Sequence, residues 1–415
     1  VIQSLLMIIA AIIVCILTFS QAEIGGWFGM LEMDAARGEA AKMHLYLPSD
    51  HPQRPWTGML SGLMILHFYY WGTNQFIAQR ALAAKSDEEA RLGIITAGFF
   101  KLLIPFISIG TGVAAFYLFS TRYPQATFVG DTAFPMLMRE VVKPIGFGLV
   151  GLVATGLVGA ILSSLDSMMN SAATLITFDV YKKFINPEAS ERRLIWVGRF
   201  CIAGFVLIAA VLTIFIMDPN SKENFFTYVA SHQSRLVAGI FVAFFVGMFW
   251  KRATPMGGLA ALIAGVFFSY TIPFIYKGIA PSIPGLTTTF GKELNFFHTV
   301  FLSAILATLT HVIVSLCTEP DEEKSKLTWS GLGVMKQSTL FKALVLILLM
   351  LGVYAFLAVQ VVNGSLLPMT AGVIGGLLTF GVIGLSALRR GGIAIDRLMA
   401  GLLAGLAIWM LFRFF

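Results

Sequence analysis

The chain has 415 residues, of which 57% are hydrophobic and only 12% are charged, and its mean hydropathy is +0.82. Soluble proteins carry about 25% charged residues, so this composition excludes a water-soluble enzyme and indicates a protein of the lipid bilayer. The net charge of +7 comes from basic residues in short segments between apolar runs. That distribution is typical of cytoplasmic loops and argues against nucleic-acid binding.

About eleven apolar runs are long enough to cross a bilayer, since a spanning helix needs about 20 mostly apolar residues. The first run starts at Val1 with no initiator methionine, basic n-region or cleavage motif, so we expect a truncated membrane protein rather than a signal peptide. In chain order the runs cover residues 1–20, 58–80, 92–119, 144–177, 193–217, 225–250, 255–276, 295–317, 340–362, 366–388 and 394–414. The fourth run is long for one span, and we expect it to tilt or to project beyond the bilayer.

Basic residues in the connections predict the orientation of these helices. Every second connection is basic, whereas the connections between them carry fewer basic residues for their length. By the positive-inside rule the basic connections are cytoplasmic, which places residues 21–57 and the C-terminus outside. The basic residues used are Arg80, Lys85, Arg91, Lys182, Lys183, Arg192, Arg193, Lys251, Arg252, Lys324, Lys326, Lys336, Arg389, Arg390 and Arg397.

The second run is too polar between residues 67 and 80 for a plain membrane helix. Its centre reads Tyr70-Trp71-Gly72-Thr73-Asn74, and we expect a helix break there, because a break at membrane depth is tolerated where it lines a cavity. Aromatic rings beside polar groups fit a sugar, whose faces are apolar and whose rim carries hydroxyls. An aromatic belt at the membrane interface is the alternative.

Lys101 lies in the third run, about ten residues from its predicted cytoplasmic start. Its side chain either extends to the interface or lies buried. A buried ammonium group would donate to substrate hydroxyls or pair with a carboxylate. Both readings stay open from the sequence.

The fourth run carries a stripe of small polar residues. At about 100° per residue, one helix face holds Ala160, Ser163, Ser164, Ser167, Asn170, Ser171 and Thr174, with Asp166 at its edge. Hydroxyl oxygens on one face can bind a small cation weakly and reversibly, and a carboxylate at membrane depth needs a cation or a proton. The alternative is a helix-packing seam, where Ser and Ala let two backbones approach closely.

Two further features have simpler readings. The polar segment 231–235 in the sixth run is either a rim or a site. Cys15, Cys201 and Cys317 lie far apart in the sequence, with no metal-binding spacing and no disulfide framework.

Taken together, these runs resemble the solute:sodium symporter family, in particular its sodium/glucose cotransporter branch. Residues 69–80 and their continuation through Lys101 to Pro105 are similar to the branch's sixth core helix and to the segment after that helix. Residues 163–181 are similar to its eighth core helix, and Phe249-Trp250-Lys251-Arg252 also matches. The resemblance covers residues 1 to about 362. It implies an all-α polytopic membrane protein with the inverted-repeat (LeuT-like) transporter fold, built from two five-helix repeats with a site at the membrane midplane.

The resemblance also implies that the fold is incomplete at the N-terminus. Residues 1–3 would fall within core helix five, so core helix one and its backbone oxygen ligands would precede this sequence. We therefore expect that this chain alone does not transport. We expect residues 1–317 to hold the remaining core and the helices that follow it, residues 318–339 to form a cytoplasmic linker, and residues 340–415 to form peripheral helices.

A sodium site on the fourth run is implied by the same resemblance. Three residues match the sodium ligands on core helix eight: Ala160, which would contribute its backbone carbonyl, and Ser163 and Ser164. Asp166 matches a position that lies beside a second sodium ion in some members, which leaves the number of ions open. The implied coupling ion is Na⁺.

The implied substrate residues come from three runs. Tyr70 matches a gating tyrosine over the sugar, Trp71 an adjacent site residue, Lys101 a donor to sugar hydroxyls, and Phe226 an apolar gate residue. His67 and Asn74 complete the predicted set from the second run.

Two residues of the chain depart from the sugar pattern. His67 stands where a bacterial sugar carrier has asparagine, and Ala230 stands where the branch has a glutamine that binds substrate. Because a missing polar partner at a hydroxyl-reading site discriminates strongly, the expected solute is a sugar or a similar small polar molecule.

The expected function is sodium-coupled symport of that solute across the cell membrane by alternating access, in a multi-pass protein surrounded by lipid. A member of the same family that carries an organic acid, an amino acid or a sialic acid is one alternative, and a solute-binding membrane sensor is another. No catalytic triad, metal cluster or phosphate loop appears, so we expect no enzymatic activity.

Overall fold

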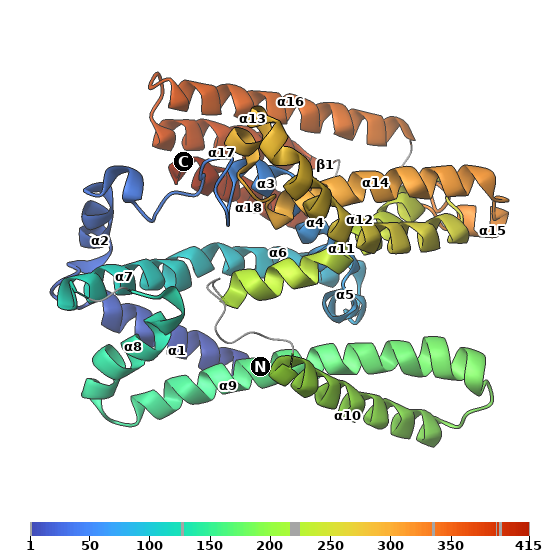
Figure 1. Cartoon of the computed structure of the whole chain (residues 1–415), viewed down its shortest axis with the longest axis horizontal. Helices are drawn as coiled ribbons and strands as arrows, with labels where there is room; N and C mark the ends of the chain where they lie inside the picture. Colours follow the sequence, from blue (N-terminus) through green and yellow to red (C-terminus); the bar gives the residue numbers. More distant parts are fainter. Residues whose placement is uncertain are drawn as a thin grey trace. The chain divides into compact units, whose positions relative to one another are not determined.

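The computed structural model describes residues 2–125, 128–215, 225–333, 337–386, 388–389 and 392–414. The chain divides into two compact units (Figure 1). The first unit comprises Val1–Met43 and Phe100–Phe225, and the second comprises His44–Phe99 and Phe226–Phe415. Helix α6 (Asp87–Ile104) passes from the second unit into the first.

In the described residues of the first unit, every regular element is a helix. Its core lies between α1, α7 and α9, where Ala10, Val14, Leu118, Phe119 and Val153 are buried. Its elements are α1 (Ile2–Phe19), α2 (Gly26–Ala35), η1 (Gly38–Ala40), η3 (Pro105–Ile109), α7 (Gly110–Arg122), η4 (Gly130–Thr132), α8 (Ala133–Leu137), η5 (Met138–Val142), η6 (Lys143–Ile145), α9 (Leu149–Leu175), η7 (Ile176–Ile185) and α10 (Glu191–Phe215). Here η3, η5 and η7 are π-helical. The predicted helix 144–177 is therefore α9 with its π-helical extension to Ile185.

A buried carboxylate orders the segment that follows α2. Asp34 is only 6% exposed, and its oxygens accept hydrogen bonds from the backbone N–H of Lys42 at 2.6 Å and of Met43 at 3.1 Å. The hydroxyl of Tyr117 on α7 donates to the same carboxylate at 2.5 Å. Asp34 thereby fixes the segment from α2 to residue 43 against α7.

The second unit contains the remaining helices and one short hairpin. They are α3 (Trp56–Leu60), α4 (Gly62–Phe68), the π-helical η2 (Tyr69–Thr73), α5 (Gln75–Leu82), α11 (Phe225–Phe249), α12 (Pro255–Ile279), η8 (Ala280–Ser282), α13 (Pro284–Phe290), α14 (Phe296–Cys317), α15 (Glu322–Ser325), α16 (Gln337–Val362), α17 (Pro368–Leu385), β1 (Leu388–Arg389), β2 (Gly392–Ile393) and α18 (Ile395–Arg413). β1 and β2 pair in antiparallel fashion. The core lies among α4, α11, α12 and α14, where Ile65, Ala238, Ala261 and Val300 are buried.

Small residues bring the helices of this unit close together. A Cβ atom on Gly265 of α12 would overlap the backbone of Gly239 on α11. On α17 and α18, Gly376 and Gly405 face each other, and a Cβ on either would lie 2.7 Å from the other's carbonyl oxygen. Such close approach is the usual packing of membrane helices, because apolar side chains gain little by leaving lipid.

Nine helices in the described residues are long and apolar enough to span a membrane. The sequence predicts about eleven such helices, and the difference lies in the first two runs. In the first run the apolar helix Leu5–Phe19 is short. The second run is broken into α3, α4, η2 and α5. The protein is an all-α polytopic membrane protein, as predicted.

Contacts between loops agree with the predicted alternation of sides. Connections predicted on one side of the membrane bond to each other within each unit. On the predicted cytoplasmic side these contacts are Arg91 Nε–Asp396 Oδ2 at 3.1 Å and Trp329 N–Met248 O at 3.0 Å, and on the outer side they are Leu45 N–Phe414 O at 2.9 Å and Arg122 Nε–Glu23 Oε1 at 2.9 Å. Lys336 and Arg390, which also support the predicted orientation, lie outside the described residues.

Candidate functional site

The predicted break in the second run is confirmed. α4 continues into the π-helical turn η2, which ends at Thr73, and Asn74 then adopts an extended backbone with φ −73° and ψ 117°. The N–H of Asn74 donates to the carbonyl of Tyr69 at 3.0 Å, which is the five-residue spacing of a π turn. A new helix, α5, starts at Gln75. π turns are rare and occur frequently at functional sites.

Four predicted substrate residues follow one another around this break. His67 lies in the last turn of α4, Tyr70 and Trp71 lie in η2, and Asn74 is the extended residue that follows η2. Tyr70 is 38% exposed and Trp71 is 45% exposed, and their ring centroids lie 5.3 Å apart in an edge-on arrangement. Two large aromatic rings therefore lie on the surface of the second unit beside the break.

The other two predicted substrate residues lie elsewhere in the chain. Phe226 is the second residue of α11 and is 72% exposed. Lys101 lies in the last turn of α6, in the first unit, and its side chain is exposed.

The predicted sodium residues all lie on α9 in the first unit. Ala160 and Ser163 are half-buried, and Ser164 and Asp166 are exposed. The hydroxyl of Ser167 donates to the carbonyl of Ser163 at 2.9 Å. Within the described residues, the Ser164 hydroxyl and the Asp166 carboxylate make no hydrogen bond or ion pair.

The polar stripe of α9 has a second interpretation from the sequence, a seam where another helix packs closely, and the packing of α9 within the first unit bears on it. Within the first unit, its buried residues are Val153, Gly156, Ser171 and Ala173. A Cβ on Gly156 would lie 3.1 Å from the carbonyl oxygen of Leu6, so α1 packs there. The seam that this unit forms along α9 thus lies outside the segment from residue 160 to residue 166.

The polar segment 231–235 is partly satisfied by its own helix. Ser234 is buried and donates to the carbonyl of Ser231 at 2.7 Å, and His232 Nδ1 lies 2.8 Å from the carbonyl of Tyr228. The guanidinium of Arg235 lies 4.7 Å from the ring centroid of Tyr270 on α12. These contacts stabilise α11 and its packing on α12, and they do not decide whether the segment is a rim or a site.

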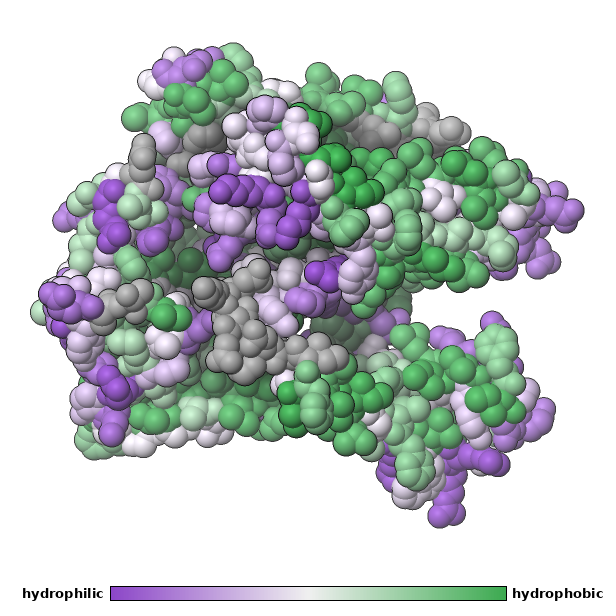
Figure 2. All heavy atoms as spheres, viewed as in Figure 1, coloured by the Kyte–Doolittle hydropathy of each residue, from purple (hydrophilic) through white to green (hydrophobic). Residues whose placement is uncertain are grey.

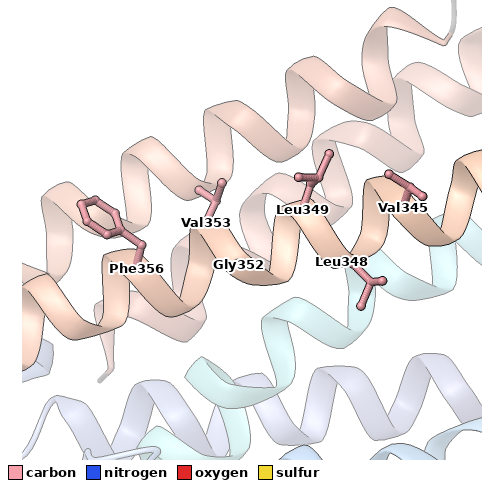
Figure 3. A pocket seen from close by; sticks show the side chains of 6 residues that line it. All are labelled: Val345, Leu348, Leu349, Gly352, Val353 and Phe356. Atoms are coloured by element: carbon pink, nitrogen blue, oxygen red, sulfur yellow. The ribbon is translucent and has the colours of Figure 1, made fainter.

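The cavities of the two units differ in their lining. Within the first unit a cavity of about 240 Å³ lies among α1, η3, α7, α8 and α9, and its polar groups come from Ser108 and Thr111. The sequence gives no sign of this cavity, because its residues come from five separate elements. In the second unit a groove of about 510 Å³ runs along α16 (Figure 3). It is lined by apolar residues and one glycine: Val345, Leu348, Leu349, Gly352, Val353 and Phe356.

Comparison with known proteins identifies the family of the chain. The model of the sodium:solute symporter family matches residues 1–265. A sodium/glucose cotransporter of Vibrio parahaemolyticus is 35% identical over 60% of this chain and 48% of its own length. The sodium/myo-inositol cotransporter 2 of Oryctolagus cuniculus is 30% identical over 79% of this chain and 52% of its own length. The chain thus spans about half the length of these curated relatives.

A solved structure supports the predicted fold. A Na⁺-coupled sialic acid symporter in a substrate-bound outward-open state aligns with a TM-score of 0.57 and 18% sequence identity, over 77% of this chain and 61% of that chain. At that identity the likeness concerns the fold, which is the inverted-repeat (LeuT-like) transporter fold. With a family model that covers well over half of its residues, the chain belongs to the sodium:solute symporter family.

Proposed function

We propose that this chain is part of a sodium-coupled symporter for a sugar or a similar small polar solute, in the cell membrane. The broken helix α4–η2–α5 carries the proposal. A discontinuous helix in a membrane carrier leaves backbone groups without helical partners, and these groups then bind substrate or ions. Here the break coincides with exposed Tyr70 and Trp71.

The proposed sodium residues are Ala160, Ser163, Ser164 and Asp166. Hydroxyl and carbonyl oxygens are hard ligands, which alkali-metal and alkaline-earth cations prefer. The neutral oxygens of Ala160, Ser163 and Ser164 bind a monovalent ion weakly, so the ion can leave on the other side of the membrane. The exposed Ser164 hydroxyl and Asp166 carboxylate support this assignment.

The proposed substrate residues are His67, Tyr70, Trp71, Asn74, Lys101 and Phe226. The aromatic rings would stack on the apolar face of a sugar ring, while Lys101 and Asn74 would bind hydroxyl groups. The relatives named as sodium/glucose and sodium/myo-inositol cotransporters favour a polyhydroxylated solute. Ala230 and His67 depart from the sugar pattern, so an organic acid, an amino acid or a sialic acid is the second candidate, with Lys101 as the partner of a carboxylate.

Coupling follows from linkage between the two ligands. Sodium that binds more tightly to the outward-open state raises the affinity for the solute, and the solute raises the affinity for sodium by the same factor. The membrane potential contributes about 2.3 kcal/mol per charge for each 100 mV. We propose no enzymatic activity, and a sensor that binds solute without moving it is the alternative of a different class.

The test is sodium-dependent uptake by the full-length protein in proteoliposomes, with a panel of sugars, polyols and organic acids. Ser164→Ala is expected to raise the sodium concentration for half-maximal uptake by about 5- to 30-fold, since a ligand that contributes as much as a hydrogen bond, roughly 1–2 kcal/mol, is lost and about 1.4 kcal/mol is a factor of ten. Thr174→Ala is the matched control, because the Thr174 hydroxyl already donates to the carbonyl of Asn170 at 2.8 Å. Uptake that is unchanged by removal of sodium contradicts the symport proposal.

A second variant tests the substrate residues. Lys101→Ala is expected to raise the KM for the transported solute with little effect on the sodium dependence, whereas Lys85→Ala, in a loop next to α5, is expected to change neither. An unchanged KM in Lys101→Ala removes this residue from the substrate site.

A further inference from the structure

The end of the α9–α10 hairpin combines exposed cations with exposed aromatic and aliphatic side chains. Four basic residues flank its short connection: Lys182 and Lys183 near the end of η7, and Arg192 and Arg193 in the first turn of α10. At 1.5 Å per residue, all four lie within roughly 5 Å of the connection along the helix axes. Each of the four side chains is exposed.

These cations have no anionic or hydrogen-bonding partner within the described part of the chain. None of them takes part in an ion pair or a side-chain hydrogen bond there. The hairpin carries Asp179, Glu188 and Glu191 as well, but Lys182, Lys183, Arg192, Arg193 and Arg199 leave it with a net charge of +2 between residues 178 and 200.

In other connections predicted on the same side, some of the cations have partners. Arg91 pairs with Asp396 at 3.1 Å, and Arg252 donates to the backbone carbonyls of Ser315 and Thr318 at 2.6 and 2.9 Å. The segment 318–333 carries two lysines against four carboxylates. The hairpin end therefore differs from these connections in the number of such cations, because it gathers four exposed basic side chains that make no ion pair or side-chain hydrogen bond within the described residues.

Aromatic rings lie beside these cations. Lys182 Nζ lies 5.8 Å from the ring centroid of Phe178, and Lys183 Nζ lies 5.4 Å from that of Phe184. One to two turns along α10, the guanidinium of Arg199 lies 5.1 Å from the ring of Trp196. Phe184 is 73% exposed, and Phe178 and Trp196 are about half exposed. Figure 2 shows hydrophilic residues gathered at the end of the hairpin and hydrophobic residues along its length.

This arrangement matches one environment, the boundary between lipid headgroups and acyl chains. Aromatic side chains prefer that depth, and Lys and Arg stems lie along apolar surface while their charged groups reach the headgroups. Arg192 and Arg193 also lie at the positive end of the α10 dipole, which disfavours cations and favours a nearby anion. An anionic headgroup phosphate would pair with the cations there, and acyl chains would cover the exposed rings.

We propose that the end of the α9–α10 hairpin is a binding surface for anionic phospholipid. Lys182, Lys183, Arg192 and Arg193 bind the headgroup phosphate, while Phe178, Phe184 and Trp196 anchor the surface at the acyl boundary. This surface lies wholly within the first unit and does not depend on the sodium or substrate assignments.

Trp196 supplies the probe. The full-length protein is reconstituted in phosphatidylcholine vesicles that contain increasing fractions of phosphatidylglycerol with brominated acyl chains, or of brominated phosphatidylcholine, and tryptophan emission is recorded. The Trp196 contribution is obtained by subtracting the signal of Trp196→Phe. Brominated phosphatidylglycerol is expected to quench Trp196 at an at least about tenfold lower mole fraction than brominated phosphatidylcholine. Tenfold corresponds to about 1.4 kcal/mol, which one or two of the four cations supply at about 1 kcal/mol each.

Two double variants, Lys182→Gln with Lys183→Gln and Arg192→Gln with Arg193→Gln, are each expected to lose most of this preference while the protein stays folded. The matched control replaces Lys251 and Lys326, two lysines of other connections predicted on the same side, with glutamine. This variant is expected to keep the preference for brominated phosphatidylglycerol. The preference is also expected to fall at about 1 M salt, where the Debye length is about 3 Å. Equal quenching by the two lipids, or an equal loss in the control variant, overturns the proposal.

Discussion

Replacing Asp34 with asparagine is expected to loosen the segment between α2 and residue 43 without unfolding the helices around it. The carboxylate accepts two backbone N–H groups and the Tyr117 hydroxyl. In Asp34→Asn, one oxygen becomes an NH₂ group, which cannot accept a hydrogen bond and points its own protons at a donor.

The magnitude follows from the bonds that are lost. A hydrogen bond to a charged group contributes about 1.5–3 kcal/mol, and the substitution removes at least one such bond at a buried position. If the segment opens locally, the free energy of opening falls by that amount. Every 1.4 kcal/mol is a factor of about ten in the opening equilibrium, so the amides of Lys42 and Met43 should exchange with solvent about 10- to 150-fold faster.

Hydrogen exchange followed by mass spectrometry on the peptides that cover residues 36–46 measures this change. Glu32→Gln is the matched control, because Glu32 lies on the same helix and its side chain is exposed. Tyr117→Phe should give a smaller effect, since it removes one donor and leaves both backbone bonds. Unchanged protection in Asp34→Asn, or equal effects of Asp34→Asn and Glu32→Gln, would refute the reasoning.

Two further outcomes are expected. Gly265→Ala should destabilise the protein by about 1–3 kcal/mol, since the new methyl group overlaps the Gly239 backbone. Gly278→Ala on the same helix is the control, because its methyl group meets no atom within 4 Å and the change should be nearly neutral. Thermal unfolding in detergent compares the two variants, and equal melting temperatures would contradict the packing argument. His51 Nδ1 accepts from the N–H groups two and three residues later at 3.2 and 3.1 Å, and burial, followed by the charge of Arg54, lowers its pKa. The neutral ring is therefore the folded form, so this turn should be stable above about pH 6.5, the ordinary pKa of histidine, and lose stability as the pH falls through the lowered pKa of His51. Amide exchange at residues 53 and 54 at two pH values measures this, and His51→Gln should abolish the pH dependence.

The sequence predicts the membrane helices well because hydropathy acts over a whole helix. Nine of the apolar runs appear as spans in the described residues, and the break beside Trp71 is confirmed because glycine and polar residues at membrane depth have few structural alternatives. The break at Ser61 between α3 and α4 was not expected. It lies next to a contact that no local pattern signals, since a Cβ on Gly62 would overlap the backbone of Phe297 on α14.

The candidate site is less accessible to sequence reasoning. Side-chain chemistry identifies Tyr70 and Ser164 as single positions, and helical spacing groups each with its neighbours. Whether two such groups act together depends on packing between helices far apart in the chain, which no local pattern encodes. The length of η7 is a second example, because nothing in residues 176–185 signals a π-helix rather than an α-helix. The division of the chain at residues 318–339 and the roles of the site residues stay predictions.

The π turn at Tyr69–Thr73 has a mechanical consequence. A π turn holds one residue more than the α turn it replaces, so it is a stored register shift. If that extra residue moves along the helix, the side chains it passes rotate by about 100° while the helix ends move by only about 1.5 Å. A shift of the π turn would therefore turn Tyr70 and Trp71 toward or away from a solute with little displacement of α4 or α5.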